Sequence, residues 1–377
     1  MDKPRRGLAV LGFSLLLLLS AAVLYGGFAL LRSLSGSKLL AALLAVVWGI
    51  GSVVLLYYVL NRGAEMLPRR ARRYLLPLVF AGPALALLFW FLVLPTLRTL
   101  WLAFFDETST RFLFLRNFRF AFTDPIMLEG FRNNLLWMVF GTLFCVGLGL
   151  VIAVLADRSR WEKLYKAVIF MPMAISFVGA GVIWKFVYSY KGEAAGLQEI
   201  GLLNAVAVAL GGRAQPWLLL GGWNNLLLIA IMVWLQTGYA MVILSSAIKA
   251  VPKELLEAAR MDGAGELRIF TGVTIPSIRG TLLTVTTTIV IFSLKLFDIV
   301  RVMTGGNWGT NVIANEFYMQ QFTYGQTGRA SAIAIVLLLA VIPVMVYNLR
   351  RFGESRAFKC GGVWKSGAGL ACSGMPS

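Results

Sequence analysis

The chain has 377 residues, of which 35 are Lys or Arg, 17 are Asp or Glu and none is His, and its formal net charge is +18. Hydrophobic residues make up 59% of it and charged residues only 14%, against about 25% charged residues in soluble domains. Such a composition predicts a polytopic membrane protein. Without His there is no Ser-His-Asp triad, His general base or His-ligated metal. Cys145, Cys360 and Cys372 have spacings typical of neither a disulfide framework nor a metal site.

Eight apolar runs are long enough to cross a bilayer, since a spanning helix needs about 20 apolar residues. The runs lack the alternating pattern of barrel strands, so we expect helices. They are Leu8–Leu31, Leu39–Leu60, Tyr74–Leu94, Leu135–Ala156, Ala167–Tyr188, Leu226–Ile248, Thr281–Met303 and Ala330–Leu349. The first run could also be a signal peptide, but its length and the lack of a clear cleavage site favour an anchor. The predicted fold is all-α, with about eight transmembrane helices.

The distribution of basic residues predicts the orientation of these helices. If the N-terminus is cytoplasmic, the inner segments hold 22 of the 35 Lys and Arg residues, as the positive-inside rule requires. Both termini are then cytoplasmic. The positive charge follows membrane-flanking loops instead of gathering on one face, so we expect no nucleic-acid partner.

Three expected outer loops are long, namely Thr96–Asn134, Ser189–Asn225 and Thr304–Arg329. Such loops can bind a partner outside the membrane, and the first could equally pack on the membrane surface. The last stretch, residues 353–377, is rich in Gly, Ser and Cys and is expected to be a disordered cytoplasmic tail.

The segment between the sixth and seventh runs, Val251–Gly280, has the sequence VPKELLEAARMDGAGELRIFTGVTIPSIRG. Pro252 suits the first turn of a helix, and strong helix formers follow it. Gly263 permits a reversal of the chain, and a second helix is expected to begin near Glu266. A short helix with small side chains on a cytoplasmic loop could dock in a groove of another protein. It could also lie on lipid headgroups as an interfacial helix.

This segment resembles the EAA loop of the permeases of binding-protein-dependent ABC importers. The matching residues are Glu257, Ala258 and Ala259, then Asp262 and Gly263, with Val273 and Ile275 standing where the family has Ile and Leu, and Pro276. The runs MPMAISFVGAGVIWKFVY (171–188) and TGGNWGTNVIANEFY (304–318) are similar to the alpha-glucoside branch of the carbohydrate-uptake permeases. Other members of that branch take up maltose, sucrose, trehalose or glucosylglycerol.

The resemblance implies an architecture and a set of partners. Residues 74–352 would form the type I permease domain, with a core of six helices and a coupling loop at 251–280, and residues 1–73 would add a tail and two helices. The chain would pair with a second permease in the bacterial inner membrane. A cytoplasmic ATPase dimer would dock at Glu257, Ala258, Ala259, Asp262 and Gly263, and a periplasmic sugar-binding protein would deliver the sugar.

The same resemblance places the energy source on another subunit. The chain has no GxxxxGK[ST] phosphate loop, so ATP and Mg would bind the partner ATPase and this chain would be no enzyme and hold no cofactor. Alternating access would carry the sugar across.

The sugar is expected to contact residues of the sixth and seventh runs. The maltose-permease site, carried over by its motifs, falls on Tyr239, Phe292 and Ser293, and Trp234 and Gln236 offer further aromatic and polar groups. Met232, Ile289 and Leu296 are apolar where that site has Asn or Ser. Tyr239 and Ser293 could instead form hydrogen bonds between spans.

Two intramembrane charges, Lys295 and Asp298, are three residues apart. With Arg301 they lie along one side of the expected seventh helix. Buried charges are costly without a partner, so an ion pair between Lys295 and Asp298 is favoured over direct contact with a neutral sugar.

Other functions remain open from the residues alone. An ABC permease for a different solute, such as a phosphate ester, is the nearest alternative, although the sixth run supplies no basic residue for it. An autonomous carrier or channel would leave the EAA spacing without a role. A membrane enzyme would need a cluster of catalytic groups, which the sequence does not offer.

Overall fold

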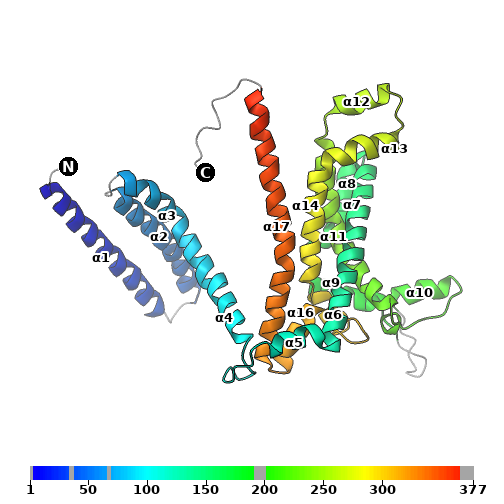
Figure 1. The fold of residues 1–377 in the computed structure, drawn as a ribbon, viewed down its shortest axis with the longest axis horizontal. Helices are drawn as coiled ribbons and strands as arrows, with labels where there is room; N and C mark the ends of the chain where they lie inside the picture. Colours follow the sequence, from blue (N-terminus) through cyan, green and yellow to red (C-terminus); the bar gives the residue numbers. More distant parts are fainter. Residues whose placement is uncertain (1–2, 34–37, 66–68, 191–200, 366–377) are drawn as a thin grey trace. The chain divides into compact units, whose positions relative to one another are not determined.

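The computed structural model describes residues 3–33, 38–65, 69–190 and 201–365, which form helices and their connections (Figure 1). Outside the helices, the described residues contain one isolated antiparallel bridge, between Phe105 and Phe112. The chain divides into two compact units, residues 1–98 and 99–377. The prediction of an all-α chain is therefore confirmed.

The first unit contains three long apolar helices. They are α1 (Lys3–Ser33), α2 (Lys38–Glu65) and α3 (Arg69–Leu88), the last continued by the π-helical turn η1 (Phe89–Val93) and by α4 (Leu94–Leu102), which extends into the second unit. The hydroxyl of Tyr57 on α2 donates to the carbonyl of Phe80 on α3 at 3.0 Å, and their rings stack at 6.2 Å. Most other large apolar side chains described here are exposed, as expected of helices that face lipid.

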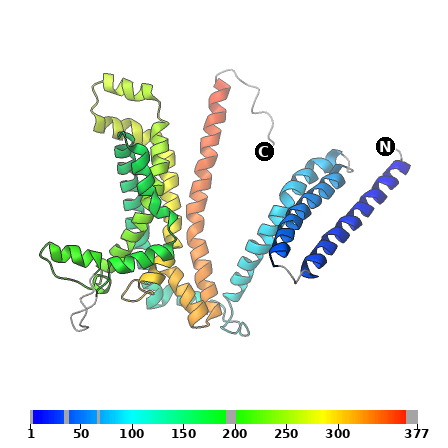
Figure 2. The ribbon, with the colours of Figure 1, turned by 180° about the vertical axis from the view of Figure 1, so that it is seen from behind.

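The second unit is built around α11. Its spanning helices are α6 (Pro125–Leu136) with η2 (Trp137–Gly141) and α7 (Thr142–Asp157), then α11 (Trp223–Lys249), then α13 (Glu266–Ile269) with η6 (Phe270–Thr274) and α14 (Ile275–Leu294), and α17 (Thr327–Lys365). Helix α11 packs against α7, α8 and α14 (Figures 1 and 2). This unit therefore has an interior, whose largest buried side chains include Trp137, Met232 and Ile289.

The other helices of this unit are shorter. They are α5 (Arg116–Thr123), α8 (Glu162–Phe170), η3 (Met171–Ala174), α9 (Phe177–Val187), α10 (Leu202–Ala209), η5 (Trp217–Leu219), α12 (Lys253–Met261), α15 (Asp298–Met303), α16 (Ile313–Tyr318) and η7 (Met319–Thr323). Three of them, α8, η3 and α9, together form a bent span.

Glycines allow α11 to approach its neighbours closely. A Cβ atom on Gly149 of α7 would lie 2.6 Å from the Cβ atom of Ala240, and one on Gly238 of α11 would lie 2.6 Å from the carbonyl oxygen of Ile169. Small residues at such crossings are the usual means by which membrane helices pack, because no hydrophobic force between them exists in lipid.

The number of spans agrees with the sequence prediction. Among the described residues, seven helical segments are long and apolar enough to cross a membrane, and a bent pair makes an eighth. That pair, Glu162–Ala174 and Phe177–Val187, bends by 101°. Pro172 lies in a 3₁₀ turn, Ile175 is extended, and the Ser176 side chain caps α9 by accepting from the Gly179 amide at 3.0 Å. A straight fifth helix was therefore the wrong expectation.

Two other expectations differ from the structure. The seventh helix was expected to reach Met303, but α14 ends at Leu294 and α15 begins at Asp298. The tail from residue 353 was expected to be disordered, but α17 continues to Lys365, because Glu, Arg, Ala and Lys extend an existing helix readily. Residues 366–377 lie outside the described residues. The expected domain boundary at residue 73 stays a prediction, since the compact units divide after Arg98.

Candidate functional site

The segment that follows α11 forms a short helical hairpin. Val251 is buried against the interior, and α12 carries Glu257, Ala258 and Ala259 outside it. The amide of Gly263 donates to the carbonyl of Arg260, and the amide of Ala264 to that of Ala259. These bonds form a Schellman motif. Gly263 has φ +77°, a value that favours glycine.

The hairpin exposes apolar side chains. Met261 is 88% exposed and Leu267 77%, and Leu255 on α12 is also exposed. Glu257, Ala258, Asp262 and Gly263 are exposed as well, and Ala259 is half-buried. The side chains of Leu255, Met261 and Leu267 give the hairpin a small exposed apolar surface. The structure thus presents the predicted coupling residues on one short, rigid and accessible element.

The breaks in the fifth and seventh spans meet at a cavity of about 410 Å³. The Phe177 ring at the start of α9 lies 4.9 Å from the Phe292 ring near the end of α14, between ring centroids. The cavity is lined by Phe177, Thr288, Ile291, Phe292, Lys295, Leu296, Phe297, Asp298 and Ile299. It therefore combines aromatic faces with a hydroxyl, an ammonium and a carboxylate group.

Lys295 and Asp298 do not form the expected ion pair: among the described residues the structure has no contact within 4.0 Å between their charged groups. The expectation assumed a continuous helix, but the helix ends between them. Lys295 instead caps the C-terminus of α14, where the helix dipole favours a cation. Both side chains line the cavity.

Arg301, the third charge of that expected row, has a separate role. Its guanidinium lies 4.5 Å from the centroid of the Tyr318 ring, and Nη1 donates to the sulfur of Met319 at 3.2 Å. A cation over an aromatic face is stabilised by the ring quadrupole. Arg301 therefore holds α15 against α16.

Of the residues expected to contact the sugar, the structure places only one in the cavity between the broken helices. Phe292 lines the cavity. Ser293 is buried, and its hydroxyl donates to the carbonyl of Ile289 in its own helix at 2.9 Å. Trp234 lines a second, largely apolar cavity of about 580 Å³ between η2–α7 and α11. Tyr239 and Gln236 are half-buried on α11 and line neither of these two cavities.

Phe177 is a cavity residue that was not predicted from the sequence. The available signal was local, since Pro172 and the capping Ser176 predict an interruption just before it. A helix break at membrane depth is tolerated where it lines a cavity.

The loop between α15 and α16, residues 304–312, lies at the end of the second unit opposite α12 (Figure 1). The Asn133 amide group donates to the carbonyls of Gly309 (2.9 Å) and Asn311 (2.7 Å), and Asn224 donates to the carbonyl of Trp308 (2.6 Å). These bonds tie the loop to α6 and α11. They hold Trp308 exposed at φ +57°, a backbone conformation that persists only when its surroundings fix it.

Residues 145–358 match the family described as "Binding-protein-dependent transport system inner membrane component". The chain belongs to this family. The match includes both the hairpin and the cavity between the broken helices.

Two permeases of known systems are similar in sequence to this chain over most of their own length. The "Osmoprotective compounds uptake permease protein GgtC" of Synechocystis sp. is 56% identical over 274 residues, which cover 73% of this chain and 98% of that protein. The "Alpha-glucoside transport system permease protein AglF" of Rhizobium meliloti is 46% identical over 275 residues, which cover 73% and 81%.

The fold is similar to that of a solved transporter. A chain of the bacterial alginate ABC transporter, in complex with an alginate pentasaccharide-bound periplasmic protein, superposes with a TM-score of 0.64 at 18% identity. The superposition covers 74% of this chain and 94% of that chain. At this identity the likeness establishes the permease fold.

Proposed function

We propose that this chain is a permease subunit of an ATP-driven importer that carries an alpha-glucoside or a related neutral glycoside across the bacterial inner membrane. The observation that carries the proposal is the cavity at the two helix breaks, in a chain of the permease family. The alpha-glucoside class comes from AglF, which is 46% identical.

The cavity has the chemistry that binds a neutral sugar. Sugar rings present apolar C–H faces and hydroxyl edges, so they require aromatic surfaces together with hydrogen-bonding groups. The rings of Phe177 and Phe292 supply the first, and Thr288, Lys295 and Asp298 supply the second. One ammonium and one carboxylate group carry no net charge together. This balance favours a neutral, polyhydroxylated solute over a phosphate ester.

In this proposal, a partner ATPase supplies the energy for transport. The α12 hairpin, with exposed Leu255 and Met261, would dock in a groove of a cytoplasmic ATPase dimer that holds ATP and Mg. The chain itself would act as a transport subunit without catalysis. Closure of the ATPase would move α12 and thereby the spans that it joins.

The remaining partners are proposed from the family to which the chain belongs. A second permease would complete the pathway as a heterodimer, and a sugar-binding protein would dock on the outer face. The C-terminus would be cytoplasmic, because the α12 hairpin, the α7–α8 connection and the C-terminal part of α17 lie at one end of the second unit and are rich in Lys and Arg (Figure 1). The N-terminus would be cytoplasmic by the distribution of Lys and Arg along the sequence.

A second candidate substrate class is supported by GgtC, a permease for osmoprotective compounds that is 56% identical to this chain. An osmoprotective glycoside would bind the same cavity through the same aromatic and polar groups. A betaine is the competing osmolyte, because its quaternary ammonium group can lie on an aromatic face and its carboxylate can pair with Lys295. The alpha-glucoside relative AglF favours the glycoside.

The test is uptake by the complete transporter in a bacterial host that lacks glycoside import. Labelled trehalose, sucrose, maltose, glucosylglycerol and glycine betaine would be offered one at a time. We expect uptake of at least one glycoside that depends on ATP and on the binding protein. Uptake of betaine alone, or uptake without the ATPase, would contradict the proposal.

A further inference from the structure

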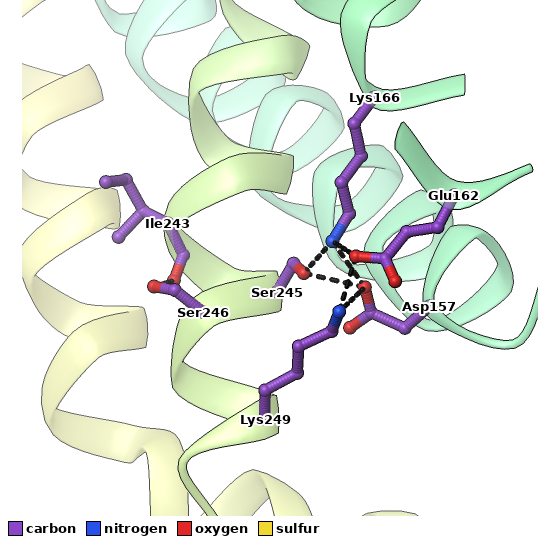
Figure 3. A network of polar contacts seen from close by, with 7 residues as sticks. All are labelled: Asp157, Glu162, Lys166, Ile243, Ser245, Ser246 and Lys249. Atoms are coloured by element: carbon purple, nitrogen blue, oxygen red, sulfur yellow. Dashed lines mark hydrogen bonds and ion pairs between the residues drawn. The ribbon is translucent and has the colours of Figure 1, made fainter. Parts of the chain in front are cut away.

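A cluster of charged groups joins three helix ends in the second unit (Figure 3). The Lys166 ammonium lies 2.5 Å from Asp157 Oδ1 and 2.6 Å from Glu162 Oε1. The Ser245 hydroxyl accepts from Lys166 and donates to Asp157 Oδ1 at 2.7 Å, and Lys249 donates to Glu162. These five residues are named the charge cluster.

The charge cluster is electrically balanced and sheltered at its centre, while Lys249 at its edge is 49% exposed. The side chain of Asp157 is 12% exposed and that of Lys166 is 18% exposed. Two carboxylates face two ammonium groups, so their charges offset each other. Removing one member would leave a poorly solvated charge without its partner, which is far more disruptive than the loss of an exposed surface pair. The geometry of the helix ends is therefore fixed by these contacts.

The cluster lies directly before the α12 hairpin. Asp157 ends α7, Glu162 and Lys166 lie on the first turns of α8, and Ser245 and Lys249 end α11. Only three residues separate Lys249 from the start of α12. The cluster therefore connects the base of the hairpin to the α7–α8 elbow, residues 158–161.

A second contact ties the far side of the hairpin to the same elbow. Glu266, the first residue of α13, accepts from Arg158 of the elbow and from Arg260 of α12, both at 3.0 Å. These groups are exposed, so this contact contributes little stability by itself. The contact matters for its position, because it links the α7–α8 elbow to both α12 and α13.

From the elbow, α8 leads to the broken span. It ends at Phe170, and η3 then continues to Ala174, just before the 101° bend and Phe177. The close approach of Gly238 to Ile169 and Phe170 packs α8 against α11. Helices α8 and α11 consequently form one stiff body, with the charge cluster at one end and the cavity residue Phe177 at the other.

We propose that the charge cluster positions the α7–α8 elbow as a second coupling element. A displacement of the α12 hairpin is then carried through the cluster and along α8 to Phe177, where it changes the cavity. Lys166 and Asp157 are the positioning residues. This inference rests on the proposed function, since it assigns the route by which ATPase closure reaches the site.

The test compares two lysines of α8 in the reconstituted transporter with its companion permease, ATPase and binding protein. Lys166→Met removes the central cation of the cluster. Lys163→Met changes an exposed lysine three residues away for which the described structure gives no ion pair or hydrogen bond. The measured quantity is the number of ATP molecules hydrolysed per sugar imported, per assembled complex.

We expect Lys166→Met to raise that ratio severalfold, because ATP hydrolysis would then continue without moving the cavity, while Lys163→Met leaves it unchanged. Lys166→Arg should restore most of the coupling. An unchanged ratio in Lys166→Met, with or without a lower yield of complex, would overturn the proposal.

Asp157→Asn serves where Lys166→Met does not assemble, because it keeps the shape and one acceptor oxygen for Lys166 and Ser245. It removes the charge and replaces the buried Oδ2 with an amide group. A raised ratio in Asp157→Asn supports the proposal, and failure of both variants to assemble would show a purely structural role and overturn it. Failure of the proposed function is distinct, since the wild-type complex itself would then import no glycoside.

Discussion

The centroid of the Phe177 ring lies 4.9 Å from the centroid of the Phe292 ring. The two residues belong to different spans, and each span is interrupted next to its phenylalanine. Phe177 follows the 101° bend of the fifth span, and Phe292 precedes the end of α14. Breaks at membrane depth free backbone groups from helical hydrogen bonds, and such breaks are the usual sites of substrate binding in transporters. The contact thus links the substrate cavity to the two elements best able to change shape.

The turn after α12 should depend on glycine at one position. Gly263 has φ +77°, so Gly263→Val should strain the turn by about 1–3 kcal/mol. We expect loss of sugar uptake and of ATP hydrolysis stimulated by the binding protein, with normal insertion of the spans. Transport assays and ATPase assays on the purified complex measure both.

Two controls isolate the backbone effect. Gly263→Asn should retain much of the activity, because Asn tolerates a positive φ. Gly265→Ser should be tolerated, since Gly265 has φ −67° and is the N-cap of α13, a position that favours Ser. Normal stimulated hydrolysis and normal uptake in Gly263→Val would remove the hairpin from the coupling mechanism.

The cavity assignment can be tested with two threonines of α14. Thr288→Val removes a hydroxyl that lines the cavity, whereas Thr284→Val removes one that does not. Both hydroxyls also donate to a carbonyl four residues earlier, at 2.8 Å and 3.0 Å. We expect Thr288→Val to raise the transport KM about five- to tenfold, the effect of one lost hydrogen bond, and Thr284→Val to leave it unchanged. Equal KM values would argue against this cavity.

Lys295 and Asp298 should act on the sugar and not on each other. Because no ion pair joins them in the described residues, Lys295→Met and Asp298→Asn should each raise the transport KM, and the double variant should be worse than either. An ion pair would give the opposite result, since removing both partners would be milder than removing one. Uptake titrations of the three variants distinguish the outcomes.

Ser293 and Tyr239 remain predicted residues of the transport pathway. Ser293 is buried and lines neither of the two cavities, so Ser293→Ala should change uptake less than Thr288→Val does. Tyr239→Ala should lower uptake with the complex intact if the ring faces the pathway. A Tyr239→Ala transporter with wild-type uptake would remove it from the site.

The packing of α8 on α11 should tolerate no side chain at Gly238. A Cβ atom there would lie 2.6 Å from the Ile169 carbonyl oxygen, so Gly238→Val should destabilise the fold by about 1–3 kcal/mol through overpacking. We expect a lower yield of assembled complex by size-exclusion chromatography. Gly147→Val is the control, because no heavy atom lies within 4 Å of its Cβ position, and it should assemble normally.

Topology can be tested by cysteine labelling after Cys145, Cys360 and Cys372 are replaced. Leu210 is 83% exposed beyond α10, and Met261 is 88% exposed at the end of α12. Leu210→Cys should react with an impermeant thiol reagent in intact cells, and Met261→Cys only after permeabilisation. The reverse pattern would invert the proposed orientation.

Local features of the chain were predicted correctly from sequence. The number of spans follows from the length of each apolar run, and the reversal at Gly263 follows from local backbone preferences. The two short helices on either side of this reversal were also expected, and the coupling role of their residues stays a prediction. All these features depend on neighbouring residues alone, so no knowledge of tertiary contacts is needed to find them.

Tertiary structure decided how the intramembrane polar groups are used. Periodicity placed Lys295 and Asp298 on one side of a helix, but the helix ends between them and both line a cavity. Conversely, Lys166 reaches Ser245, 79 residues away in the chain. The sequence by itself determined which segments cross the membrane, because each segment's transfer into lipid depends on its own composition. Which charges and rings meet depends on helix breaks and crossings, and these are set by packing between distant segments.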